Sequence, residues 1–95
     1  MKPKKEKLER EFEIANKQGL HARPAALFVQ TANQFQSEIE VEKDGNKVSG
    51  KSIMGIMTLA AEAGSKVMVR VSGPDAEQTL NAIAKLFETN FGEAE

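Results

Sequence analysis

A chain of 95 residues is near the small end of what one hydrophobic core can stabilise, so we expect a single domain. The absence of cysteine and the single histidine exclude a disulfide framework, a thiolate zinc site and a clustered histidine metal site. A net charge of −1 argues against a nucleic-acid partner, and no apolar run approaches the roughly 20 residues of a membrane span. We therefore predict a soluble, cytoplasmic domain without metal or cofactor.

Lysines crowd the start of the chain, which lacks the apolar segment of a signal peptide. We interpret residues 1–7 as a disordered basic tail, because such charge blocks are usually solvated, and residues 8–93 as the domain. Over residues 8–14, glutamates at every second position alternate with mainly apolar side chains. This period of two predicts a strand with one face in water, and a loop around Gly19 follows it.

A helical period begins after His21. Pro24 suits a first helical turn, and the stretch 22–33 carries the apolar stripe of an amphipathic helix. We expect four side chains of this stripe to face the core: Ala25, Phe28, Val29 and Ala32.

Two short strands are predicted next. Apolar residues alternate with glutamates over 37–43, which indicates a second strand with one polar face. The dipeptide Asp44-Gly45 favours a tight hairpin turn, since both residues tolerate positive φ. The return strand over 46–49 is short and polar, as suits a sheet edge.

Ser52 is placed to cap a short helix over 51–59. We expect its core side to be formed by Ile56, Leu59 and Ala60, and its solvent side by Ile53, Met54 and Met57. Alternating valines over 66–72 predict a fourth strand. The last helix opens after Gly73-Pro74, and its predicted apolar stripe comprises Ala76, Leu80, Ile83, Ala84, Phe87 and Phe91.

These elements follow one another in the order β-α-β-β-α-β-α. Because every strand has one polar face, helices should cover one face of a mainly antiparallel sheet and water the other. The sequence thus predicts an α+β fold.

His21 lies between the predicted loop and the first predicted helix. Histidine is a nucleophile, and the free N–H groups and positive dipole end of a helix N-terminus would stabilise a phosphoryl group held there. Arg23 would add a planar fork of donors for phosphate oxygens. The residues alone leave two interpretations open: a phosphoryl-accepting histidine, or a histidine that merely caps a helix.

The chain resembles the HPr family, the phosphocarriers of the phosphoenolpyruvate-dependent sugar phosphotransferase system. The similarity runs from Glu11 to Glu93 and is carried by GLHARPAA at 19–26, KSIMGIMTLAAEAG at 51–64 and VRVSGPDAEQTL at 69–80. The resemblance implies an open-faced β-sandwich, with a four-stranded antiparallel sheet covered on one face by three helices. This expectation agrees with the element order derived above.

The resemblance also implies a relay. His21 would be phosphorylated at Nδ1 by the phosphohistidine of enzyme I and would pass the phosphoryl group to an acceptor on an enzyme IIA domain. Arg23 would orient and neutralise the phosphate, and the backbone N–H groups of Ala22 and Arg23 would bind it. The protein would be a covalent carrier and not an enzyme. We expect a monomer, because a relay must leave its docking face free.

Ser52 is typical of a helix cap, but the surrounding KSIMG resembles the segment that an HPr kinase/phosphorylase modifies in many relatives. This implies regulatory phosphorylation of Ser52, which we expect to impair docking to enzyme I. Apolar side chains near His21 predict a shared docking face, since methionines repack easily against several partners. The residues expected there are Leu20, Ala26, Leu27, Gln30, Ile53, Met54 and Met57.

Two alternatives stay open. Asn16-Lys17 and the ending LFETNFGEAE are similar to the nitrogen-related branch of these carriers. In the other alternative the protein is a regulatory binding module, in which phosphorylated Ser52 recruits a transcription factor. The sugars or regulators downstream are not encoded here, because specificity resides in the acceptors.

Overall fold

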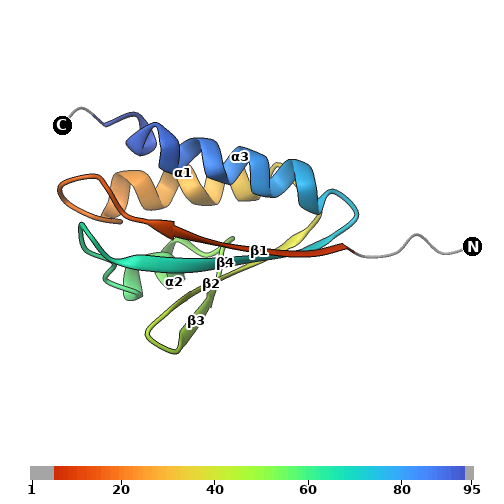
Figure 1. Ribbon diagram of the computed structural model, residues 1–95, viewed down its shortest axis with the longest axis horizontal. Coiled ribbons are helices and arrows are strands. Elements are labelled where there is room, and N and C mark those ends of the chain that lie inside the picture. The colour runs from red at the N-terminus through yellow and green to blue at the C-terminus, as the bar shows by residue number, and fades with distance from the viewer. Residues whose placement is uncertain (1–5, 94–95) are drawn as a thin grey trace, which may run out of the picture.

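The computed structural model describes residues 6–93, which form four strands and three α-helices in the predicted order (Figure 1). The strands are β1 (Glu6–Glu13), β2 (Glu38–Lys43), β3 (Asn46–Ser49) and β4 (Lys66–Gly73). The helices are α1 (Ala22–Ala32), α2 (Ile53–Thr58) and α3 (Ala76–Glu88), and the 3-10 turn η1 (Asn90–Gly92) follows α3. In this part of the chain no helix combines the length and the apolar composition needed to cross a bilayer.

The domain begins two residues earlier than the predicted boundary at residue 8. Strand β1 already begins at Glu6, and Lys7 pairs with Ser72 of β4. The sequence pattern missed this extension because backbone pairing does not require the alternation of apolar and polar side chains. The rest of the predicted disordered tail, residues 1–5, lies outside the described residues.

The strands form one antiparallel sheet in the order β1-β4-β2-β3. Helices α1 and α3 lie over one face of this sheet (Figure 1), and α2 packs against α1 and β3. On the inner face Val41 pairs with Val69, and both are fully buried. On the outer face Arg70 pairs with Glu9 and Glu40 on either side. The predicted open-faced α+β sandwich, covered by helices on one face, is confirmed.

The turn between β2 and β3 has the predicted tight form. Asp44 and Gly45 both have positive φ, at 52° and 82°. This conformation matches the right-handed twist of the two flanking strands. The pairing of Lys43 with Asn46 then sets the register of the hairpin.

An aromatic cluster centred on Phe87 of α3 fills the core. The Phe87 ring stacks on Phe12 of β1 at a centroid distance of 4.4 Å. It meets Phe28 of α1 at 6.4 Å and Phe91 of η1 at 5.0 Å, both edge to face. Such aromatic pairs contribute about 0.5–1.5 kcal/mol each beyond the burial of their surface. The cluster thus fixes α1, α3 and the end of the chain on the sheet.

Some predicted core positions are wrong in detail. Ala60 is exposed, with a φ of 50°, because α2 ends at Thr58 and the chain turns away. Val29 of α1 is only partly buried. Phe91 is buried as expected, but it follows α3 in a left-handed turn instead of continuing the helix.

The loop before β2 is tied to the start of α3 by Asp75. Its carboxylate accepts hydrogen bonds from the backbone N–H groups of Gln36 and Ser37, each at 2.9 Å, and from the Ser37 hydroxyl. The Ser37 hydroxyl, followed by the Gln36 N–H group, holds the pKa of Asp75 at about 2, below its ordinary value of 3.8. The buried Ser37 is satisfied in this way, and the clasp aligns α3 on the sheet.

Candidate functional site

His21 is the N-cap of α1. Its backbone is extended, with φ −79° and ψ −170°, and its carbonyl accepts the first helical hydrogen bond from Ala25 N–H at 3.0 Å. Inside the helix the N–H groups of Ala22 and Arg23 have no acceptor, because the first turn of an α-helix leaves its donors free. Pro24 brings no N–H group to this turn. Two backbone donors therefore lie next to His21, at the positive end of the helix dipole.

The imidazole ring is held by a carboxylate from the other end of the chain. His21 Nε2 lies 3.0 Å from Glu93 Oε2, and the two side chains are 32% and 18% exposed. Glu93 Oε1 accepts a second hydrogen bond, at 2.8 Å, from Nδ2 of the buried Asn16. Asn16 Nδ2 also donates to Gly19 O at 2.9 Å. These hydrogen bonds join loop 14–20, the start of α1 and Glu93 in one network. Figure 1 shows that loop 14–20, the start of α1 and the segment after α3 lie at the same end of the molecule.

Neither Asn16 nor Glu93 was among the predicted site residues. Glu93 is 72 residues from His21 and Asn16 is 77 residues from Glu93, so no local spacing connects them. The only sequence signal is an asparagine in the loop before the histidine and a glutamate just after the last aromatic residue. Both features were noted, but only as signs of the branch within the family.

Gly19 lets loop 14–20 approach the segment after α2. Its φ is +70°, and a Cβ atom there would overlap the Ala61 carbonyl oxygen. That same carbonyl accepts a hydrogen bond from Leu20 N–H at 2.8 Å. The close approach brings Met57, Ala60 and Glu62 to the rim of a shallow hollow beside His21. This glycine is therefore required by the shape of the site.

Arg23 lies in the first turn of α1 and its side chain is exposed. Among residues 6–93, its guanidinium takes part in none of the ion pairs, which leaves it available for an anion on the neighbouring His21. Arg70 differs, because Glu42, Glu40 and then Glu9 bind its guanidinium and raise its pKa. Of these two arginines, only Arg23 lies in the same helical turn as His21.

Exposed apolar side chains gather on α2, as predicted. Among the described residues the exposed large hydrophobic side chains are Ile53, Met54 and Met57, of which Met54 is 69% exposed. Helix α2 packs against α1, where Ala26 and Leu27 are partly buried and Gln30 is exposed. The prediction that Leu20 belongs to the docking face is wrong. This side chain packs into the core and is only 4% exposed.

Ser52 is the N-cap of α2, and its Oγ accepts a hydrogen bond from Gly55 N–H at 3.0 Å. The side chain is partly buried. It lies directly before Ile53 in the chain, so a group added to its hydroxyl would lie beside the exposed apolar residues of α2.

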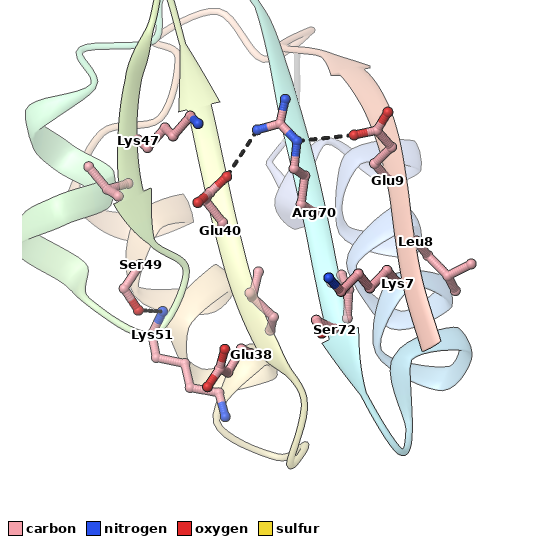
Figure 2. A pocket seen from close by; sticks show the side chains of 13 residues that line it. Lys7, Leu8, Glu9, Glu38, Glu40, Lys47, Ser49, Lys51, Arg70 and Ser72 are labelled. Atoms are coloured by element: carbon pink, nitrogen blue, oxygen red, sulfur yellow. Dashed lines mark hydrogen bonds and ion pairs between the residues drawn. The ribbon is translucent and has the colours of Figure 1, made fainter. Parts of the chain in front are cut away.

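A second hollow, of about 970 Å³, lies elsewhere, on the outer face of the sheet (Figure 2). Figure 2 shows Arg70 at its centre, between Glu9 of β1 and Glu40 of β2. All four strands contribute to its lining, which combines charged and hydroxyl side chains with the apolar residues Leu8, Ile39, Val48 and Val71, and none of loop 14–20 contributes. We interpret it as the solvated face of the sheet, where Arg70 is already paired with Glu9 and Glu40.

Comparisons with known proteins agree on one family. The family model described as "PTS HPr component phosphorylation site" matches residues 8–89. The HPr-like protein Crh of Halalkalibacterium halodurans is 49% identical over 81 residues, which cover 85% of this chain and 96% of the relative. The phosphocarrier protein HPr of Neisseria meningitidis serogroup A is 46% identical over 88 residues, which cover 93% of this chain and 99% of the relative.

Solved structures give the same answer. A crystal structure of HPr from Thermoanaerobacter tengcongensis has a TM-score of 0.89 at 53% identity and covers 93% of this chain and 99% of its own. A second structure from that organism, described as an HPr dimer, has a TM-score of 0.74 at 56% identity, with coverage of 86% and 94%. The similarities define the class of the protein as a small phosphocarrier domain, which is not itself an enzyme. The chain belongs to the HPr family of the phosphotransferase system.

Proposed function

We propose that the protein accepts a phosphoryl group from phospho-enzyme I on Nδ1 of His21 and passes it to enzyme IIA domains in the cytoplasm. One observation carries this proposal: His21 lies at the N-terminus of α1, next to free backbone donors and the exposed Arg23. Nε2 is the ring nitrogen bound to Glu93, so Nδ1 is the nitrogen that can receive the group.

The charges support this assignment. A phosphoryl group on Nδ1 would receive hydrogen bonds from the N–H groups of Ala22 and Arg23 and the charge of the Arg23 guanidinium. Phosphoryl transfer depends mainly on positioning and on stabilisation of the oxygens, so His21 needs no separate acid or base. The arrangement suits a group that is accepted and released repeatedly.

The experiment is intact-mass analysis after incubation with enzyme I, phosphoenolpyruvate and Mg²⁺. We expect one acid-labile phosphoryl group on the protein and none on His21→Ala. Because His21 is the only histidine, the control removes every phosphohistidine site at once. An unmodified protein with the enzyme I of both the sugar and the nitrogen branch would contradict the proposal.

The partners are proposed to dock on the surface formed by Ile53, Met54 and Met57, with Ala26, Leu27 and Gln30 at its border. Methionine suits a surface that must fit several partners in turn, because its side chain repacks at little cost. The relaying form is proposed to be a monomer, with this surface uncovered. Sedimentation at increasing concentration tests it, and a dimer, as described for one HPr structure, is the opposing outcome.

We further propose that an HPr kinase/phosphorylase phosphorylates Ser52. The phosphate would take over as acceptor for the Gly55 N–H group and would place about two negative charges beside the apolar docking surface. Burying that surface against enzyme I would then be unfavourable, without any refolding. A Ser52→Asp variant that accepts phosphate from enzyme I at the unmodified rate would contradict this.

The similarity to an HPr-like protein Crh favours one additional candidate function. Phosphorylated Ser52 would bind a transcriptional regulator, while His21 remains a carrier. A pull-down with the phosphorylated protein and its Ser52→Ala variant distinguishes the two roles. Binding that needs Ser52 but not His21 supports the regulatory role.

A further inference from the structure

The backbone before Glu93, the last described residue, is fixed by a left-handed turn. Asn90, Phe91 and Gly92 all have positive φ, at 53°, 55° and 72°. This conformation is unfavourable for phenylalanine, yet the Phe91 side chain is only 3% exposed and packs edge to face on Phe87. The turn closes with a hydrogen bond from Glu93 N–H to Asn90 O at 3.0 Å. The core thus fixes the backbone from which Glu93 extends.

Asn16 fixes the carboxylate from the other side. Its Nδ2 donates to Gly19 O and to Glu93 Oε1, and because both oxygens only accept, the orientation of the amide is determined. The Asn16 residue is 1% exposed, so these bonds are made away from water. Glu93 Oε2 is thereby directed at the imidazole ring.

The carboxylate determines which ring nitrogen carries the proton. An ionised carboxylate only accepts hydrogen bonds, so His21 Nε2 must be the donor across the 3.0 Å contact with Glu93 Oε2. In the neutral ring Nδ1 then carries the free electron pair. We infer that Glu93 and Asn16 are positioning residues for the phosphoryl transfer: they hold His21 in the Nε2–H tautomer. This inference rests on the proposed function.

The phosphoryl transfer requires no movement of the proton on His21 Nε2. The Nδ1 electron pair of His21 attacks the phosphorus, the Nδ1–P bond forms, and the bond from phosphorus to the donor nitrogen of enzyme I breaks. The Nε2 proton stays on the ring, which becomes positively charged and hydrogen-bonds more strongly to Glu93. When the next acceptor attacks, the Nδ1–P bond breaks and neutral imidazole leaves. Glu93 therefore favours the charged intermediate in both directions of the relay.

The direct test is nitrogen-15 NMR of the His21 ring at neutral pH, for the wild type, Glu93→Ala, Glu93→Gln and Glu88→Ala. Glu88 is an exposed glutamate at the end of α3 and serves as the control. We expect a protonated Nε2 and a bare Nδ1 in the wild type and the control. In Glu93→Ala we expect a shift toward the Nδ1–H tautomer. Glu93→Gln keeps only one acceptor oxygen, so its NH2 group must face either Asn16 Nδ2 or His21 Nε2, and we expect a weaker preference for the Nε2–H tautomer than in the wild type.

The kinetic test measures phosphoryl transfer from phospho-enzyme I to the same four proteins. We expect a roughly tenfold slower step for Glu93→Ala, the rate equivalent of one hydrogen bond to a charged group, and an intermediate rate for Glu93→Gln. Thermal unfolding verifies that each variant is folded. Ring signals and rates of Glu93→Ala equal to those of Glu88→Ala would overturn the inference. If the wild type accepts no phosphoryl group, the proposed function fails, while the ring signals still decide whether Glu93 holds His21 in the Nε2–H tautomer.

Discussion

The substitution Ala60→Gly should stabilise the protein, although it removes a methyl group. Residue 60 lies outside α2, so the hydrogen bonds that cap this helix are unchanged. Ala60 is exposed and has a φ of 50°, so its side chain contributes little packing and its backbone is in the left-handed region. A residue with a Cβ atom loses about 1–2 kcal/mol in that region relative to right-handed backbone. Glycine avoids this loss, and its greater freedom in the unfolded chain costs about 0.5–1 kcal/mol.

The net expectation is a gain of about 0.5–1 kcal/mol in the free energy of unfolding. For a domain of this size that corresponds to roughly 2–8 °C in Tm. The matched control is Ala63→Gly, the same change at an exposed alanine three residues away whose φ is not positive. There the glycine has only its entropic disadvantage, and we expect a loss of about 0.4–1 kcal/mol.

Urea unfolding at constant pH, followed by circular dichroism, measures both variants against the wild type. The two substitutions should shift the midpoint in opposite directions with unchanged slope. If Ala60→Gly is destabilised as much as Ala63→Gly, left-handed strain at position 60 is not a significant term, and the reasoning is wrong.

Three further predictions concern the core, the acid stability and the docking surface. Phe91→Ala should cost about 3–5 kcal/mol, as for other buried phenylalanines, and in the same NMR experiment it should release His21 Nε2 from Glu93. The Asp75 carboxylate has a pKa of about 2 against an ordinary 3.8, so the stabilisation from its hydrogen bonds is complete above about pH 4 and is lost as pH falls toward 2. Acid unfolding of the wild type should show this loss of stability, and Asp75→Asn should lack that part of the pH dependence. Met54→Lys at the most exposed position of α2 should raise the KM for enzyme I while the stability changes by less than about 0.5 kcal/mol, and an unchanged KM would exclude Met54 from the docking surface.

The sequence predicted the fold well because its signals are local. Alternating glutamates along β1 and β2, and the turn at Asp44-Gly45, each specify their structure within a few residues. The exposed face of α2 followed in the same way from spacings of three and four. His21 and Arg23 were singled out from their local sequence, but only the resemblance to the HPr family favoured a phosphoryl-accepting histidine over a helix cap.

The carboxylate on His21 could not be predicted, because its position depends on the tertiary structure. Glu93 reaches the ring only after α3 has packed on the sheet and the left-handed turn has reversed the chain. A helical pattern that continues through Phe91 would direct residue 93 elsewhere, and the periodicity alone gives no sign that the helix ends at Glu88. Long-range pairs of this kind appear only in three dimensions.

The place of Glu93 beside His21 has a practical consequence for how the protein should be handled. A purification tag or fluorescent partner joined directly behind Glu93 would begin close to the His21 ring, the phosphoryl acceptor proposed above, and we expect it to hinder the approach of a partner. The start of β1, at Glu6, lies at the opposite end of the molecule (Figure 1). Fusions should therefore be made at the N-terminal side, and a protein tagged at its other terminus that transfers slowly should be retested after the tag is removed.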